Sequence, residues 1–184
     1  EKDAQIVGLK DEIIKKIDSR PELSNKIHIA ISPTKNINRF EWFIEKSIEL
    51  GLSEITPILT LHSERSKLNY ERLIKKMITA LKQSKNLYLP KLNPIINFQN
   101  FIKTKHQAQK FICHNENKNN HYLKDKLIKG QKYLILIGPE GGFSSDEVKI
   151  AENNGFEQVL LGDSRYRTET AGILSCHTIH LFAT

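Results

Sequence analysis

The chain has 184 residues, of which 39% are hydrophobic and 27% charged, and this suits one main domain of ordinary globular composition. No apolar run approaches the length of a membrane span and no signal-peptide pattern opens the sequence, so we expect no membrane segment. Two isolated cysteines argue against a disulfide framework and fit a reducing cytoplasm, where we expect the protein to reside.

The charge is distributed unevenly along the chain. Overall, 28 basic and 21 acidic residues give a net charge of +7. From residue 131 onward 4 basic and 7 acidic residues leave −3, so the first 130 residues carry +10. A positive field of this kind favours a polyanion, most commonly nucleic acid. A solvated lysine-rich surface explains the composition about equally well.

The first 24 residues resemble the end of a separate small domain. Residues 3–8 alternate between apolar and polar, as a half-buried strand does, and residues 20–25 have the composition of a linker. This is too little chain to bury a core of its own. We therefore interpret residues 1–24 as the tail of a β domain and expect the main domain to cover residues 25–184.

A strand–helix–strand unit follows. Residues 26–32 form an apolar strand, apolar residues then recur at helical spacing from Phe40 to Leu50, and Gly51 is placed to end the helix. Residues 54–60 form the next strand. Such a unit predicts a parallel sheet with a right-handed crossover.

The middle of the chain predicts a basic helix and several short elements. The polar loop 61–66 should lie at the carboxyl edge of the sheet, and residues 70–84 form an amphipathic helix with an apolar stripe at Leu73, Met77, Ala80 and Leu81. The remaining predictions are an extended run over 90–96, a short helix over 98–103, a strand over 109–113, a polar loop over 114–120 and helical turns over 122–128.

Two strand–turn–helix units close the chain. The strand 133–137 runs into the glycine-rich turn 138–142, and Ser144 with Glu147 then has the form of a capping box. The strand 158–161 runs into Gly162, a polar loop and an apolar helix. We expect these two strands to be neighbours in a parallel sheet, so that their turns form the crevice in which open α/β sheets usually bind ligands, and we expect a cofactor there.

The two turns differ in how strongly they indicate function. The glycine-rich turn lacks the lysine of a phosphate-binding loop, and a plain strand-to-helix connection explains it as well as a ligand site does. In the second turn Thr168 suits a helix N-cap. However, Arg165, Arg167 and Glu169 beside an apolar helix would be unfavourable unless they pair or face a site. We therefore favour a functional role for this segment.

A metal site is not predicted. Cys176, His177 and His180 lie close together in the sequence, but no further ligand is suitably spaced to join them. Packed or partly exposed histidines are the favoured interpretation. No Ser-His-Asp arrangement is legible, because such triads are recognised by geometry rather than by order in the chain.

Several blocks together resemble one enzyme family. They are Ile-Gly-Pro-Glu-Gly-Gly-Phe at 137–143, Arg-Thr-Glu-Thr-Ala at 167–171, Glu-Lys-Ser-Ile-Glu-Leu-Gly at 45–51 and Glu-Arg-Ser at 64–66. The combination is similar to the bacterial 16S rRNA uracil-N3 methyltransferases, the RsmE family of the SPOUT class. The resemblance covers about residues 26–184. One departure is Lys85-Asn86, where many members have Gly-Arg.

The resemblance implies an α/β fold with a parallel sheet and a C-terminal deep trefoil knot over about residues 131–184. It identifies residues 1–24 as the remnant of a PUA-like RNA-binding domain and implies a homodimer. The implied reaction is S-adenosylmethionine-dependent methylation of a uridine at N3 in 16S rRNA of the small ribosomal subunit. The alternatives are a SPOUT enzyme acting on tRNA and a non-catalytic RNA-binding or ribosome-assembly protein.

The resemblance and the residue types together define candidate site residues. For catalysis we expect charge stabilisation by Arg165 and Arg167, with Glu140 as a base or a group that orients the base. The expected cofactor-binding residues are Thr60, Leu61, Ile137, Gly138, Pro139, Glu140, Gly141, Leu161, Gly162, Tyr166, Arg167, Thr168, Thr170 and Ala171. The expected RNA-binding residues are Arg65, Arg72, Lys75, Lys76, Lys82 and Lys85.

Overall fold

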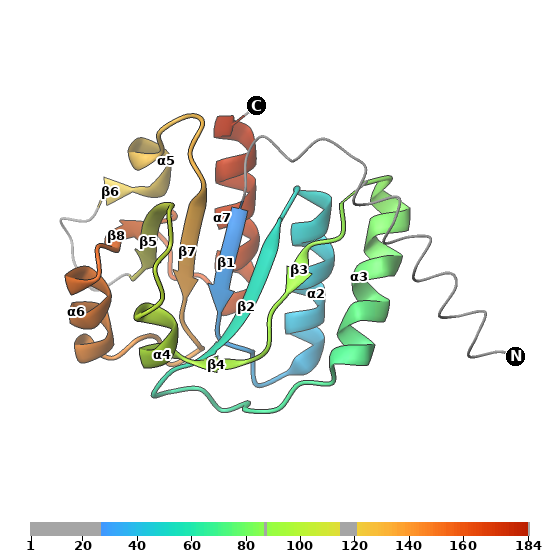
Figure 1. Ribbon diagram of the computed structural model, residues 1–184, viewed down its shortest axis with the longest axis horizontal. Helices are drawn as coiled ribbons and strands as arrows, with labels where there is room; N and C mark the ends of the chain where they lie inside the picture. Colours follow the sequence, from blue (N-terminus) through green and yellow to red (C-terminus); the bar gives the residue numbers. More distant parts are fainter. Residues whose placement is uncertain (1–26, 87, 115–120, 184) are drawn as a thin grey trace, which may run out of the picture.

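A parallel sheet forms the centre of the molecule (Figure 1). The structure is a computed structural model that describes residues 27–86, 88–114 and 121–183. The predicted β-domain remnant over 1–24 and most of the predicted loop 114–120 lie outside these ranges. The strands are β1 Ile27–Ile31, β2 Glu54–Leu59, β3 Lys91–Leu92, β4 Ile96–Asn97, β5 Gln109–Cys113, β6 His121–Tyr122, β7 Tyr133–Ile137 and β8 Glu157–Leu160.

The strand order is β3-β2-β1-β7-β5-β8-β6, with β4 also paired to β2, and every pairing between described strands is parallel. The central strand β7 has the sequence YLILI, and all five residues are buried. A continuous apolar run of this kind is what a strand covered on both faces requires. The parallel α/β sheet predicted from the sequence is therefore confirmed.

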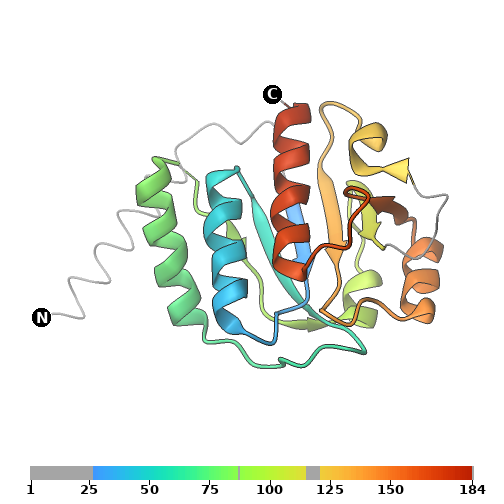
Figure 2. The same cartoon turned by 180° about the vertical axis from the view of Figure 1, so that it is seen from behind.

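Helices cover both faces of the sheet. The helices α2 Ile37–Glu49, α3 Tyr70–Ser84 and α7 Thr168–Ala183 lie on one face, where Figure 2 shows them side by side. The short helix α4 Phe98–Ile102 and the helix α6 Ser145–Asn153 lie on the other face. A further short helix, α5 Leu123–Lys126, follows β6 and contacts α7.

Alternate residues of the strands pack into two separate hydrophobic cores, one on each face of the sheet. Ile29 and Ile31 point toward α2 and α7, whereas Ala30 packs with Leu134 and Leu136 toward α4 and α6. This is the period of two expected of a strand. The central strands are thereby held from both sides, which fixes where their carboxyl ends, and the loops that follow them, lie.

Local signals set the helix boundaries. The Asn36 side chain accepts a hydrogen bond from the Asn38 N–H at the start of α2, and Gly51 follows its end with φ +78°. Lys85 follows α3 with φ +53° and is the one non-glycine residue of the described ranges with positive φ. This conformation suits glycine best, so Lys85 occupies a backbone position at which a side chain is unfavourable.

Two local predictions are wrong. Strands β7 and β8 are not neighbours, because β5 lies between them. Thr168 is not the N-cap of the last helix: it is the first residue of α7, and the Ala171 N–H bonds to the carbonyl of Arg167, 2.8 Å away. The Thr168 hydroxyl instead donates to the Gly138 carbonyl at 2.9 Å. A tertiary contact therefore takes the place of the expected capping contact.

A polar cluster occupies the amino-terminal half of β1 and β2, on the face that carries α4. His28 lies with Nε2 2.7 Å from Thr56 Oγ1 and Nδ1 3.9 Å from Glu54 Oε2. Burial lowers the pKa of His28 to about 4, although Glu54 acts in the opposite direction. His106 and Lys91 nearby add smaller contributions that also lower it. The neutral imidazole is therefore the form that the fold accommodates.

Acidification should destabilise the protein through His28. The unfolded chain binds a proton at His28 below about pH 6.5, and the folded chain does so only below about pH 4. The stability contributed by the neutral His28 is therefore fully present above about pH 6.5 and is lost as the pH falls from 6.5 to 4. We expect wild type to lose about 3 kcal/mol of unfolding free energy more than His28→Gln across that window, measured by urea denaturation. His121→Gln, at an exposed position, is the control. If the unfolding free energies of wild type and His28→Gln changed in parallel with pH, the prediction would be contradicted.

Candidate functional site

A cavity of about 400 Å³ opens at the carboxyl edge of the sheet. Its size falls within the range of small-molecule sites. Both predicted turns contribute to its wall, as residues 137–143 and most of residues 159–168, together with Ala171. The cavity therefore lies where the sequence predicts a cofactor, although it spans three strands rather than two.

The glycine-rich turn forms the first wall. The Gly142 N–H bonds to the Pro139 carbonyl at 2.9 Å, and Gly142 has φ +75°. A Cβ added at Gly138 would lie 3.1 Å from the ring of Phe143, which is buried. Bulkier residues would strain this turn, so its glycines bring backbone N–H and carbonyl groups to the cavity surface.

The loop after β8 forms the second wall. Leu161, Gly162 and residues 164–168 line the cavity, and Gly162 lies against the hydroxyl of Tyr166. Arg165, Tyr166 and Arg167 are exposed at its surface. The hydrogen bond from Thr168 to the Gly138 carbonyl joins the two walls directly. Thr170 does not line the cavity.

The end of β5 supplies a third part of the wall that sequence reasoning missed. Cys113 and His114 line the cavity because β5 lies between β7 and β8. Burial raises the pKa of the Cys113 thiol to about 12, so at neutral pH this thiol is uncharged and unsuited to nucleophilic attack. The available signal was their position at the end of a predicted strand, Cys113 as its last residue and His114 directly after it.

Two predicted cofactor residues lie elsewhere. Thr60 and Leu61, in the loop after β2, are not among the residues that line the cavity. The Thr60 N–H donates to Ser63 Oγ at 2.8 Å, and the Leu61 N–H donates to Glu147 Oε1 at 2.8 Å. This loop packs behind the glycine-rich turn: His62 Nδ1 is 3.1 Å from the carbonyl oxygen of Gly142.

The predicted catalytic residues lie along the cavity. Arg165, Arg167 and Glu140 all line it. Glu140 is exposed, and its Oε1 accepts a hydrogen bond from the Lys35 N–H at 3.1 Å. The structure thus brings the two arginines and the carboxylate to one site, with the carboxylate also tied to the loop after β1.

A second carboxylate near the start of α7 has a different environment. Glu169 is 5% exposed, and its Oε1 lies 3.7 Å from Nε of Arg39 on α2. Glu169 does not line the cavity. Its ion pair with Arg39 therefore links α7 to α2 at the end of α7 nearest the cavity. This is a structural role for a residue that the sequence placed beside a functional site.

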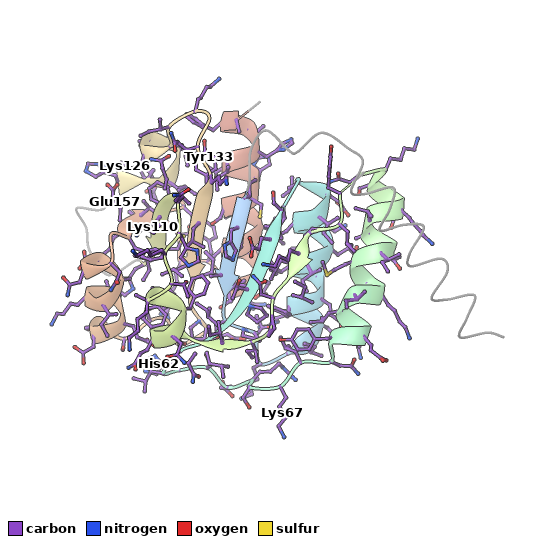
Figure 3. The ribbon with its side chains drawn as sticks, in the orientation of Figure 1. His62, Lys67, Lys110, Lys126, Tyr133 and Glu157 are labelled. Atoms are coloured by element: carbon purple, nitrogen blue, oxygen red, sulfur yellow. The ribbon has the colours of Figure 1, made fainter. Side chains whose placement is uncertain are left out.

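The predicted RNA-binding cations fall into two groups. Arg65 donates to the carbonyls of Thr34 and Lys35, at 3.1 and 2.7 Å, and Arg72 pairs with the buried Glu41 on α2. These two arginines hold loops and helices together. The other four are exposed on α3 or directly after it: Lys75, Lys76, Lys82 and Lys85. Lys67, in the preceding loop, also projects into solvent (Figure 3).

The described residues contain neither a metal-ligand cluster nor a membrane-spanning helix. Across residues 27–86, 88–114 and 121–183, no group of three or more His, Cys, Asp or Glu side chains is placed to hold a metal ion. No helix in the described part of the chain has the length and apolarity needed to cross a membrane.

Comparison with known proteins defines the class. Residues 21–180 match a family described as the RNA methyltransferase domain. A curated relative from Mesomycoplasma hyopneumoniae, "Ribosomal RNA small subunit methyltransferase E", is 34% identical over 170 residues, covering 89% of this chain and 73% of the relative.

Solved structures agree with this match. A probable rRNA-methyltransferase from Porphyromonas gingivalis superposes with a TM-score of 0.81 at 42% identity, covering 86% of this chain and 68% of the other. A ribosomal RNA small subunit methyltransferase E from Neisseria gonorrhoeae bound to S-adenosyl methionine gives 0.75 at 26% identity, covering 86% and 66%.

The fold is thus that of an RNA methyltransferase of the SPOUT type, as predicted from the sequence. Within that class, the chain belongs to the ribosomal RNA small subunit methyltransferase E family. The resemblance stated from the motif blocks is confirmed.

Proposed function

We propose that this protein transfers the methyl group of S-adenosylmethionine to N3 of a uridine in the 16S rRNA of the small ribosomal subunit. The observation that carries the proposal is the cavity walled by the glycine-rich turn and the loop after β8, in a member of this family. The relative from Neisseria gonorrhoeae, bound to S-adenosyl methionine, supports the cofactor.

The cavity suits this cofactor. Its volume of about 400 Å³ can hold a nucleoside with an amino-acid tail, and its wall combines apolar side chains with backbone groups at Gly138, Gly141 and Gly162. These groups would hold the adenine and ribose without adding charge. When bound, the cofactor supplies an electrophilic methyl group.

The exposed arginines suit the nucleotide. Uracil N3 is a weak nucleophile while it carries its proton, and the base must leave any stack to reach the site. Arg165 and Arg167 would stabilise negative charge on the uracil oxygens as the proton leaves. Glu140, which also lines the cavity, would accept that proton or orient the group that does.

The exposed lysines of α3 would contact RNA phosphates. Each phosphate contact contributes about 0.7–0.9 to the slope of log affinity against log salt. We expect the triple variant Lys75→Ala/Lys76→Ala/Lys82→Ala to bind rRNA more weakly, with a salt slope smaller by about 2–3. Filter binding over a salt series measures this, and S-adenosylmethionine affinity should be unchanged.

The control for this prediction removes the same number of charges elsewhere. Lys103, Lys105 and Lys129 are also exposed, and none of them lies on α3. The variant Lys103→Ala/Lys105→Ala/Lys129→Ala should keep the wild-type slope to within about 1. An equal decrease of the salt slope in the two triple variants would mean that RNA responds to the positive charge of the whole surface, and that α3 is not a docking surface.

Three further features belong to the same proposal. The chain crosses from β8 over β5 and β7 to reach α7 on β1, which supports a knotted connection over about residues 131–184. The helix α7 keeps Leu181 62% exposed, which supports a homodimer that covers this helix. A cytoplasmic location follows from the proposed rRNA substrate.

Methyl transfer to defined RNAs tests the function. Labelled S-adenosylmethionine is incubated with the protein and with either small ribosomal subunits or tRNA, and the nucleosides are identified by mass spectrometry. We expect 3-methyluridine from small-subunit rRNA. Methylated tRNA would instead indicate a tRNA enzyme, and the absence of cofactor binding in calorimetry would indicate a non-catalytic RNA-binding or assembly protein.

A further inference from the structure

The carboxylate of Glu147 joins two loops that are distant in the sequence. Its Oε1 accepts the Leu61 N–H at 2.8 Å, and its Oε2 accepts the Ser144 N–H at 2.8 Å and the Ser144 hydroxyl at 3.1 Å. Glu147 is 8% exposed. The capping box of α6 explains the contacts with Ser144. Capping does not explain the bond to Leu61, which lies 86 residues away.

The loop that Glu147 holds is a hydrogen-bonded turn. The Ser63 N–H bonds to the Thr60 carbonyl at 3.2 Å, and Ser63 Oγ lies 3.0 Å from Thr60 Oγ1. The same oxygen lies 2.7 Å from the hydroxyl of Ser32, which is buried at the end of β1. Residues 60–63 are therefore bonded to the end of β1, so that the central sheet sets the position of this loop.

The loop of residues 60–63 contacts the glycine-rich turn. His62 Nδ1 lies 3.1 Å from the Gly142 carbonyl oxygen, and a Cβ added at Gly141 would lie 3.0 Å from Cβ of His62. Gly141 and Gly142 line the cavity, whereas Leu61 and His62 do not. The loop after β2 therefore bears on the turn from outside the cavity.

We propose that Glu147 is a positioning residue for the cofactor. By holding the Leu61 N–H it seats residues 60–63 against Gly141 and Gly142, and this sets the backbone groups that the turn presents to the ligand. The inference rests on the proposed function only in taking S-adenosylmethionine as that ligand. It also gives Thr60 and Leu61 an indirect role in the site in place of direct contact.

Variants at three neighbouring positions separate positioning from capping. Glu147→Ala removes both functions, Ser144→Ala removes the capping hydroxyl and leaves the bond to Leu61, and Asp146→Asn removes an exposed charge from the same helical turn. Calorimetry with S-adenosylmethionine, well below each unfolding temperature, measures affinity. We expect Glu147→Ala to bind about tenfold more weakly, with kcat at saturating cofactor changed less than about threefold. The two controls should bind within about twofold of wild type.

Amide hydrogen exchange gives a readout independent of activity. In Glu147→Ala the amides of Leu61, Gly141 and Gly142 should exchange faster, because the loop and the turn loosen together. In Ser144→Ala faster exchange should be confined to the first turn of α6. Faster exchange at Leu61 and Gly141 in Ser144→Ala as well would mean that capping alone accounts for the effect, and would overturn the inference.

One more variant covers the case in which Glu147→Ala fails to fold. His62→Ala leaves the capping box intact and removes the imidazole that contacts the glycine-rich turn at Gly142, and we expect about threefold weaker cofactor binding. Unchanged affinity in His62→Ala and in any folded Glu147→Ala overturns the positioning role while leaving the proposed function intact. A wild-type protein that binds no S-adenosylmethionine overturns both.

Discussion

Replacing Arg167 by alanine should lower kcat by about 10²–10³-fold at saturating cofactor, because charge stabilisation in a preorganised site is commonly of this size. Arg167 is exposed at the cavity and lies directly before Thr168, which joins the two walls. Its side chain can therefore reach a base presented at the cavity mouth. Single-turnover methylation of small-subunit rRNA measures the effect apart from product release.

Companion variants assign this effect to charge at the site. Arg165→Ala and Glu140→Gln, both at the cavity, should also lower kcat, by about 10–10³-fold. Lys132→Ala removes an exposed charge directly before β7, at the opposite edge of the sheet, and should leave kcat unchanged. Near-normal methyl transfer by both Arg167→Ala and Glu140→Gln would show that the catalytic assignment is wrong.

Replacing Gly172 by alanine should destabilise the fold by about 2 kcal/mol or more, as overpacking of a filled core does. In an exposed helix the same change would stabilise by about 1 kcal/mol. Here the new Cβ would lie 2.5 and 2.6 Å from two ring carbons of Phe43 and 3.2 Å from Ile31 Cδ1. Phe43 and Ile31 are completely buried, so neither side chain can move away without disturbing the core.

Urea denaturation of Gly172→Ala, Phe43→Leu and the double variant tests this packing argument. A smaller side chain at position 43 makes room for the added methyl group, so the double variant should be more stable than the sum of the two single changes predicts. A Gly172→Ala protein as stable as wild type would contradict the close approach of α7 to α2.

Local signals in the sequence were sufficient for most elements. The basic helix was predicted over residues 70–84, the limits of α3 in the structure, because apolar residues recur at helical spacing within one segment. The capping box at Ser144 and Glu147 was likewise predicted and is present. The blocks around Gly138 and Arg167 also identified the family before the strand order was known.

Partners across the fold could not be predicted in the same way. Sequence alone gave no reason to place β5 between β7 and β8, so Cys113 and His114 were missed as parts of the cavity. The pairing of Arg72 with Glu41 was also missed, because Glu41 lies 31 residues earlier on another helix.

The sequence by itself therefore determined the helices, most of the strands, the glycine-rich turn and the family, because each depends on residues close together in the chain. The tertiary structure decided which of those residues meet. It pairs the Leu61 N–H with Glu147 and the Thr168 hydroxyl with the Gly138 carbonyl. The physical reason is that strand order and loop docking depend on how separate apolar faces are buried together, and this is not encoded in any single segment.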